Sequence, residues 1–247
     1  MITEKNHQCV WTPVKAPLHE VALEIFRGLS QSYDLVVDLA TLFQDRWWKK
    51  WAAAKLEVTC PRLVLDVGCG TLLFEERYPS PERHFVGLDL SRQMLTLGQD
   101  KGITNASMIV QGDAEHLPFR AAAFDSVISC YVAKYVEIGT FGNEMRRVTH
   151  QGGTVILYDF AKPRGIMAPF LLAYIGAGLR ALGLVMRITK NRMAFAFVRL
   201  PQLIENTRWD LNLVNDFKTN GIALTDARPL TGGVVFAFSG RCVADVR

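Results

Sequence analysis

Residues 64–72 read Val64-Leu65-Asp66-Val67-Gly68-Cys69-Gly70-Thr71-Leu72, and they predict the architecture of the chain around them. An apolar run ends in the acid Asp66, and two glycines one residue apart follow it. A strand that runs into such a turn lets a ligand approach the backbone closely, because Gly68 and Gly70 carry no side chain. The pattern is shared by many nucleotide-binding α/β turns, so it predicts a strand, a turn and a helix and leaves the ligand open.

Two further acids repeat this arrangement downstream. Asp89 ends the apolar run 84–89, where a Rossmann-like sheet places a carboxylate against ribose hydroxyls. Asp113, between Gly112 and Ala114, follows the next apolar run. Three acids at three successive strand ends favour a ligand with one adenosine over a dinucleotide.

The composition predicts one globular domain. A chain of 247 residues fits a single α/β domain, and its net charge of +4 is too small to predict a nucleic-acid partner. The 5 cysteines lack Cys-x-x-Cys spacing, which favours free thiols over disulfides or a metal site. Residues 1–17 contain no apolar core of a signal peptide, so we expect a cytoplasmic protein.

Strand and helix patterns alternate after residue 62. The predicted strands cover 63–67, 84–88, 107–110, 124–130, 153–159, 222–227 and 232–239, and the predicted helices cover 72–78, 91–101 and 138–148. Ser91 is the expected cap of the second helix, and Gly152-Gly153 is expected to precede the fifth strand. Residues 18–56 have helical spacing and predict an N-terminal helical cap.

These motifs resemble those of the class I S-adenosylmethionine-dependent methyltransferases. The family's glycine motif matches 66–70, its ribose-binding acid matches Asp89, and its adenine-edge acid matches Asp113. The resemblance implies an α/β fold with a seven-stranded Rossmann-like sheet, helices on both faces, an antiparallel last strand and S-adenosylmethionine as cofactor. Leu72 stands where the family has a third glycine, so we expect it to crowd the methionine end of the cofactor or to shift the helix slightly.

Three more segments narrow the resemblance to the ubiquinone/menaquinone C-methyltransferase family. Residues 33–41 running into 46–49 resemble its first signature, residues 147–163 resemble its second, and residues 230–235 match its end. The chain departs from the family at polar positions near the expected acceptor, which here are Val37, Thr41, Asp45, Lys134, Tyr135, Asp159 and Ala161. The resemblance therefore leaves the acceptor open, whereas the cofactor motif is intact.

The resemblance also implies the site residues. The expected cofactor-binding residues are Tyr33, Asp66, Gly68, Gly70, Asp89, Met94, Asp113, Ala114 and Cys130. Tyr33 either faces the sulfonium, since aromatic rings attract cations, or packs a helix onto the sheet. Methylation of a quinol carbon needs a group that removes a proton, and the candidates are Asp159, Asp34 and Lys134. Asp159 is the first choice because it ends a strand at the carboxyl edge of the sheet.

Residues 160–204 contain no acid but carry seven cations. An apolar core at 166–186, interrupted by Arg180, is too broken to predict a transmembrane helix. The segment is either a buried helix whose arginines extend to water or a lid that faces an acyl chain and an anionic membrane surface. We therefore divide the chain into a helical cap (1–56) and a cofactor-binding domain (57–247) with a basic apolar lid insertion (160–204).

The sequence thus predicts a methyltransferase for a hydrophobic small-molecule substrate, a quinol-like or isoprenoid compound methylated on carbon. One alternative is a phospholipid headgroup N-methyltransferase, because bacterial enzymes of that kind resemble the same family. The other is a non-catalytic S-adenosylmethionine-binding protein in which Leu72 has spoiled the geometry of the methyl donor.

Overall fold

The computed structural model describes residues 33–103, 106–164, 207–211 and 213–243, together with isolated positions at 20, 22–23, 166, 168–171, 173, 176 and 204. Most of the predicted lid at 160–204 and most of the predicted cap before residue 33 therefore lie outside the described residues. No helix within the described ranges is long and apolar enough to cross a bilayer.

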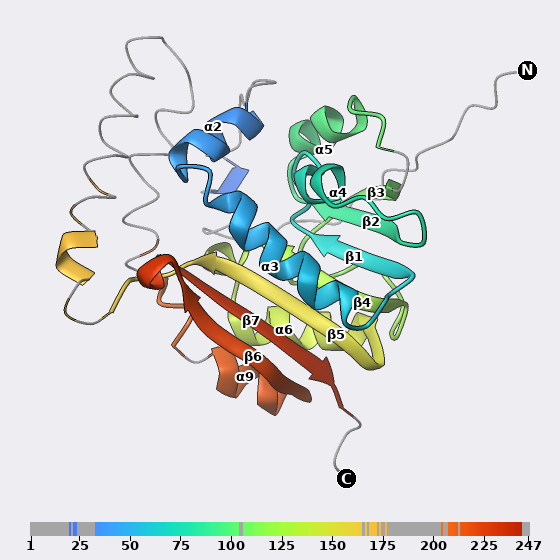
Figure 1. Ribbon diagram of the computed structural model, residues 1–247. Coiled ribbons are helices and arrows are strands. Elements are labelled where there is room, and N and C mark those ends of the chain that lie inside the picture. Colours follow the sequence, from blue (N-terminus) through green and yellow to red (C-terminus); the bar gives the residue numbers. More distant parts are fainter. Residues whose placement is uncertain are drawn as a thin grey trace, which may run out of the picture.

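In the described part of the chain a single sheet has the strand order β3-β2-β1-β4-β5-β7-β6 (Figure 1). Its strands are β1 (Leu63–Val67), β2 (His84–Asp89), β3 (Ala106–Gln111), β4 (Phe124–Cys130), β5 (Thr149–Phe160), β6 (Ile222–Leu230) and β7 (Val235–Cys242). Strands β1 to β5 pair in parallel, whereas β7 runs antiparallel to both β5 and β6. The predicted seven-stranded sheet with an antiparallel last strand is confirmed.

Helices and short turns precede and connect these strands. They are α2 (Tyr33–Ala40), α3 (Asp45–Glu57), α4 (Leu73–Arg77), α5 (Arg92–Gln99), η1 (Ala133–Tyr135), α6 (Ile138–Val148), α9 (Leu213–Thr219) and η2 (Thr231–Gly233). Ser91 caps α5 as predicted, since its hydroxyl accepts from the Met94 N–H at 3.4 Å. The expected helix over 18–56 is interrupted within its described part, where Leu42 and Phe43 between α2 and α3 have φ values of 51° and 61°.

One predicted boundary is wrong. Strand β5 begins at Thr149, so Gly152 and Gly153 lie inside it rather than before it. The register between β4 and β5 shifts between Phe124 and Ser126, where β5 contributes extra residues. Gly152 adopts a φ of 80° in this bulge, which explains why a turn-like glycine pair occurs within a strand.

Apolar layers cover both faces of the sheet. Successive strand side chains point to opposite faces, so Val64 and Phe85 pack with Trp48 and Leu56 of α3. On the other face, strand residues pack with α6 and α9 in a cluster that includes Leu65, Val86, Phe141, Met145, Leu213 and Phe217. Figure 1 shows α3 across one face and α6 and α9 on the other. This arrangement confirms the predicted helices on both faces and leaves the carboxyl ends of β1, β2 and β4 open for a site.

Candidate active site

The turn after β1 is held by its backbone. Gly68 and Gly70 have φ values of 78° and 56°. A Cβ built on Gly68 would lie 2.1 Å from Val132 Cγ2, so no side chain fits there. The N–H groups of Gly68 and Cys69 donate to the Leu88 carbonyl at 2.7 and 3.1 Å. The turn is therefore fixed against β2 with its surface free of side chains.

Asp89 joins two walls of the site. Its carboxylate accepts from the Gly70 N–H at 2.9 Å and from the Ser91 N–H at 2.8 Å. Burial raises the pKa of Asp89 to about 6, although these two N–H groups favour the charged form. Asp89 thus connects the glycine turn with the start of α5 and keeps lone pairs for a ligand.

A pocket opens beside this turn at the carboxyl ends of the strands. Each of the predicted cofactor-binding residues lines it, namely Tyr33, Asp66, Gly68, Gly70, Asp89, Met94, Asp113, Ala114 and Cys130. Asp113 at its far end is tied to its own turn, since its carboxylate accepts from the Glu115 N–H at 2.9 Å. A bare glycine turn next to three acids fits a ligand with an adenosine group and a polar tail.

Two of the three predicted catalytic residues bond to each other instead of facing this pocket. Lys134 Nζ donates to Asp159 Oδ1 at 2.8 Å, and the backbone N–H of Lys134 donates to Asp159 Oδ2 at 3.0 Å. Both side chains are buried, and neither lines the pocket. Burial lowers the pKa of Lys134 and raises the pKa of Asp159. The structure thus places the pair behind the pocket wall, where it fixes η1 to β5.

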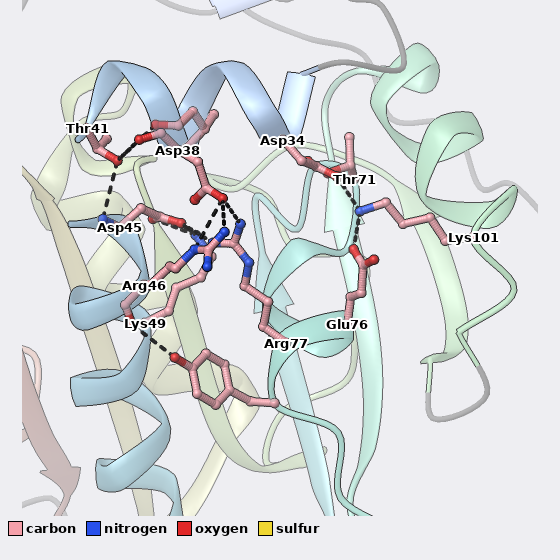
Figure 2. Close-up of polar contacts among 12 residues, drawn as sticks. Asp34, Asp38, Thr41, Asp45, Arg46, Lys49, Thr71, Glu76, Arg77 and Lys101 are labelled. Atoms are coloured by element: carbon pink, nitrogen blue, oxygen red, sulfur yellow. Dashed lines mark hydrogen bonds and ion pairs between the residues drawn. The ribbon is translucent and has the colours of Figure 1, made fainter. Parts of the chain in front are cut away.

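Asp34 is also engaged outside the pocket lining. Its carboxylate accepts from the Thr71 hydroxyl at 2.6 Å and from Lys101 Nζ at 2.5 Å. Figure 2 shows this contact between α2 and the turn before α4. Asp34 therefore fastens the helical cap over the glycine turn and does not line the pocket, and its role as a base stays a prediction.

Among the pocket-lining residues that sequence reasoning did not assign to the site are Lys49 and Tyr131. Lys49 Nζ donates to both oxygens of Asp45, at 2.7 and 2.9 Å, and the Tyr131 hydroxyl donates to Asp45 at 2.6 Å. Arg77 connects Asp45 to Asp38, with contacts of 2.9 and 2.8 Å (Figure 2). The i,i+4 spacing of Asp45 and Lys49 on one helix face was the available signal, whereas Tyr131 lies far away in the sequence, in the turn after β4.

Of the two expectations for Leu72, crowding of the pocket is not what the structure shows, because Leu72 does not line it. The residue has a φ of 58° and a ψ of 33°, the left-handed conformation that glycine adopts readily. Its side chain is buried against Cys69, Leu95 and Ile109. Thr71 and Leu73 line the pocket, whereas Leu72 does not. The chain keeps a glycine-like backbone here, and the methionine end of the site stays free.

Comparison with known proteins agrees with this geometry. The family model described as "Methyltransferase domain" matches residues 65–157. A demethylmenaquinone methyltransferase of Streptomyces avermitilis is 31% identical over 90% of this chain and 94% of its own length. One of the same name from Mycobacterium marinum is 30% identical over 87% and 91%.

Among solved structures, geranyl diphosphate methyltransferase in complex with GPP and sinefungin has a TM-score of 0.53 at 13% identity, over 80% of this chain and 78% of that one. This likeness concerns the fold alone. The near-full-length relatives and the intact glycine turn assign the family. The chain therefore belongs to the ubiquinone/menaquinone C-methyltransferase family and is an S-adenosylmethionine-dependent methyltransferase.

Proposed function

We propose that the protein methylates a ring carbon of a quinol-like, apolar acceptor. The observation that carries the proposal is the near-full-length similarity to relatives named demethylmenaquinone methyltransferase. The pocket supports it, because apolar and aromatic side chains continue its wall beyond the glycine turn, among them Val37, Phe74, Tyr131, Val132, Tyr135 and Val136. Such a wall suits a flat, water-insoluble ring.

The cofactor would be held by the residues that line the pocket around the glycine turn. The Gly68–Gly70 backbone, Asp66 and Asp89 would bind its methionine and ribose parts, and Met94, Asp113 and Ala114 would enclose its adenine. Bound there, it supplies a methyl group on a sulfonium sulfur. Tyr33 and Cys130 complete the wall, and the Tyr33 ring is a suitable neighbour for that cation.

We propose that the Lys49 ammonium donates a hydrogen bond to an oxygen of the acceptor. A lysine ammonium has three N–H donors, and among the described residues Lys49 donates only to Asp45. One donor therefore remains for an oxygen in the pocket. An ammonium at this place stabilises a phenolate, which makes the neighbouring ring carbon nucleophilic. Lys134 and Asp159 then act as positioning residues, because their ion pair fixes Tyr135 and Tyr131 at the pocket wall.

The proposed activity is tested with purified protein, S-adenosylmethionine and a short-chain demethylated naphthoquinol kept reduced in detergent micelles. The expected product is the ring-methylated quinol, identified by mass spectrometry and by loss of the ring C–H signal. Micelles that contain phosphatidylethanolamine or a prenyl diphosphate in place of the quinol test the other acceptor classes. Methylation of either one with an unchanged quinol would overturn the proposal.

A matched pair of variants tests Lys49. Lys49→Met should lower turnover about 10²-fold, the effect of removing one donor to a developing oxyanion, and leave the affinity for S-adenosylhomocysteine unchanged. Lys50→Met, at the exposed neighbouring position, should keep full turnover. Equal rates for wild type and Lys49→Met would remove Lys49 from the acceptor site.

We further propose that the turn between α2 and α3 rests on an anionic membrane surface, from which an apolar acceptor would arrive. Leu42, Phe43 and Trp47 are exposed there, Trp47 by 77%, next to the exposed cations Arg46 and Lys50. Tryptophan favours the bilayer interface, and cations attract anionic lipids. Trp47→Ser should reduce sedimentation with anionic vesicles, whereas Val58→Ser at the other end of α3 should not; equal sedimentation of both would contradict this.

A further inference from the structure

Asp66 and Glu75 form a buried acid pair beside the pocket. Asp66 lies in β1 and is 2% exposed, and Glu75 lies in α4 and is 0% exposed. Within the described ranges, no donor reaches Asp66 Oδ1 or either carboxyl oxygen of Glu75. The two carboxyl groups lie close enough to interact electrostatically with each other. Only Asp66 lines the pocket, so Glu75 acts from behind it.

Two negative charges cannot coexist in this arrangement. A buried carboxylate without donors is strongly disfavoured, and a second carboxylate at close range adds repulsion. One proton between the two groups removes the repulsion and supplies the missing hydrogen bond. Burial accordingly raises the pKa of Glu75 to about 7, and burial together with the neighbouring Glu75 raises the pKa of Asp66.

The surrounding groups do not replace that proton. The charged and titratable neighbours of the pair are Lys49 on α3, Asp89 on β2, Lys101 after α5, and the thiols of Cys69 and Cys130. Lys49 directs two N–H groups to Asp45. Lys101 directs its ammonium to Asp34 and Glu76. Asp89 adds negative charge, so among the described residues the pair has no cation of its own.

We propose that Asp66 and Glu75 share one proton in the ligand-free protein and release it when the ammonium group of the cofactor's methionine end binds against Asp66. The proton passes to solvent from a carboxyl O–H, and the bound ammonium takes over its charge-balancing role. The inference rests on the family's cofactor and goes beyond it, because it makes Glu75 a positioning residue that sets the charge of Asp66. Cofactor affinity then increases with pH through the range in which the pair titrates.

Calorimetry in buffers of different ionisation enthalpy counts the released protons. The probes are S-adenosylhomocysteine and 5′-methylthioadenosine, which has the same nucleoside thioether but no amino-acid end. At a pH of about 6, below the Glu75 pKa of about 7, the pair holds its shared proton, and the wild-type protein should release about one more proton for the first ligand than for the second. Protons released from Asp89 cancel in this difference, since both ligands carry the ribose.

Two variants on one helix sharpen the test. Glu75→Gln should abolish the difference in released protons, because the amide donates to Asp66 and leaves no proton to share. Glu76→Gln is the matched control: the side chain is 47% exposed and paired with Lys101, so the difference should persist. Equal proton release for the two ligands in the wild type would overturn the proposal even if Glu75→Gln did not fold. Wild-type protein that bound neither ligand would instead contradict the cofactor assignment.

Discussion

Two strand ends at the same edge of the sheet place their acids in different roles. Asp89 lies at the end of β2 and lines the pocket. The hydrogen bonds described above for its carboxylate come only from backbone N–H groups. Asp159, the penultimate residue of β5, bonds to the Lys134 ammonium and lies behind the pocket wall. Backbone donors orient a carboxylate and leave it available, whereas a buried cation occupies it. A strand-end position is therefore insufficient to identify a ligand-binding acid.

The greatest loss is expected on the β5 side of this comparison, when the buried cation is removed. Lys134→Met leaves the Asp159 carboxylate buried without its cation, so the free energy of unfolding should fall by about 3–5 kcal/mol. Urea denaturation measures the loss. The double variant Lys134→Met/Asp159→Leu replaces the ion pair by apolar side chains and should regain most of that stability. Full stability with abolished turnover in Lys134→Met would instead indicate a catalytic lysine.

On the β2 side, a smaller effect is expected, and it concerns ligand affinity rather than the free energy of unfolding. Asp89→Ala removes the acceptor for ribose hydroxyls and should weaken S-adenosylhomocysteine binding by about 1.5–3 kcal/mol, while Lys134→Met leaves that affinity unchanged per folded molecule. Calorimetry measures both. An unchanged affinity in Asp89→Ala would remove Asp89 from the site and make the two strand ends alike.

The titration of Asp89 should affect the stability of the free protein and its affinity for the ligand in opposite directions as the pH rises. Its pKa is raised from 3.8 to about 6 in the folded protein. The stability that this group contributes to the free protein is therefore fully present below pH 3.8 and is lost as the pH rises through about 6. The ligand needs the carboxylate, so affinity should fall as the pH decreases through about 6. Titration of wild type against Asp89→Asn isolates both trends, and parallel curves for the two proteins would contradict them.

The sequence predicted the cofactor side of the pocket because its determinants are local. A strand, a glycine turn and a capped helix fix where Asp66, Gly70 and Asp89 lie, and Ser91 caps α5 as expected. The pairing of Lys134 with Asp159 joins residues far apart in the sequence. The contact of Tyr131 with Asp45 is equally non-local, because it joins the turn after β4 to α3. No periodicity encodes such contacts, so the acceptor side required the structure.

Leu72 is an exception within the local part, and it gives the smallest expected effect. The helical pattern predicted an ordinary helix start there, but Leu72 is left-handed while Leu73 begins α4. At a left-handed position, glycine avoids the steric cost that every other residue carries. The free energy of unfolding of Leu72→Gly should therefore be about 1 kcal/mol higher than that of Leu72→Ala.

The same pair of substitutions at Leu73 provides the control. Leu73 is the first helical residue of α4, where alanine should be more stable than glycine by about 0.5–1 kcal/mol. Comparing glycine with alanine at each position cancels most of the lost leucine packing, which would otherwise dominate the measurement. A reversal of sign between the two neighbouring positions, measured by urea denaturation, demonstrates the left-handed backbone. Alanine more stable than glycine at both positions would show that residue 72 adopts an ordinary helical conformation and that its leucine is accommodated by a shift of α4.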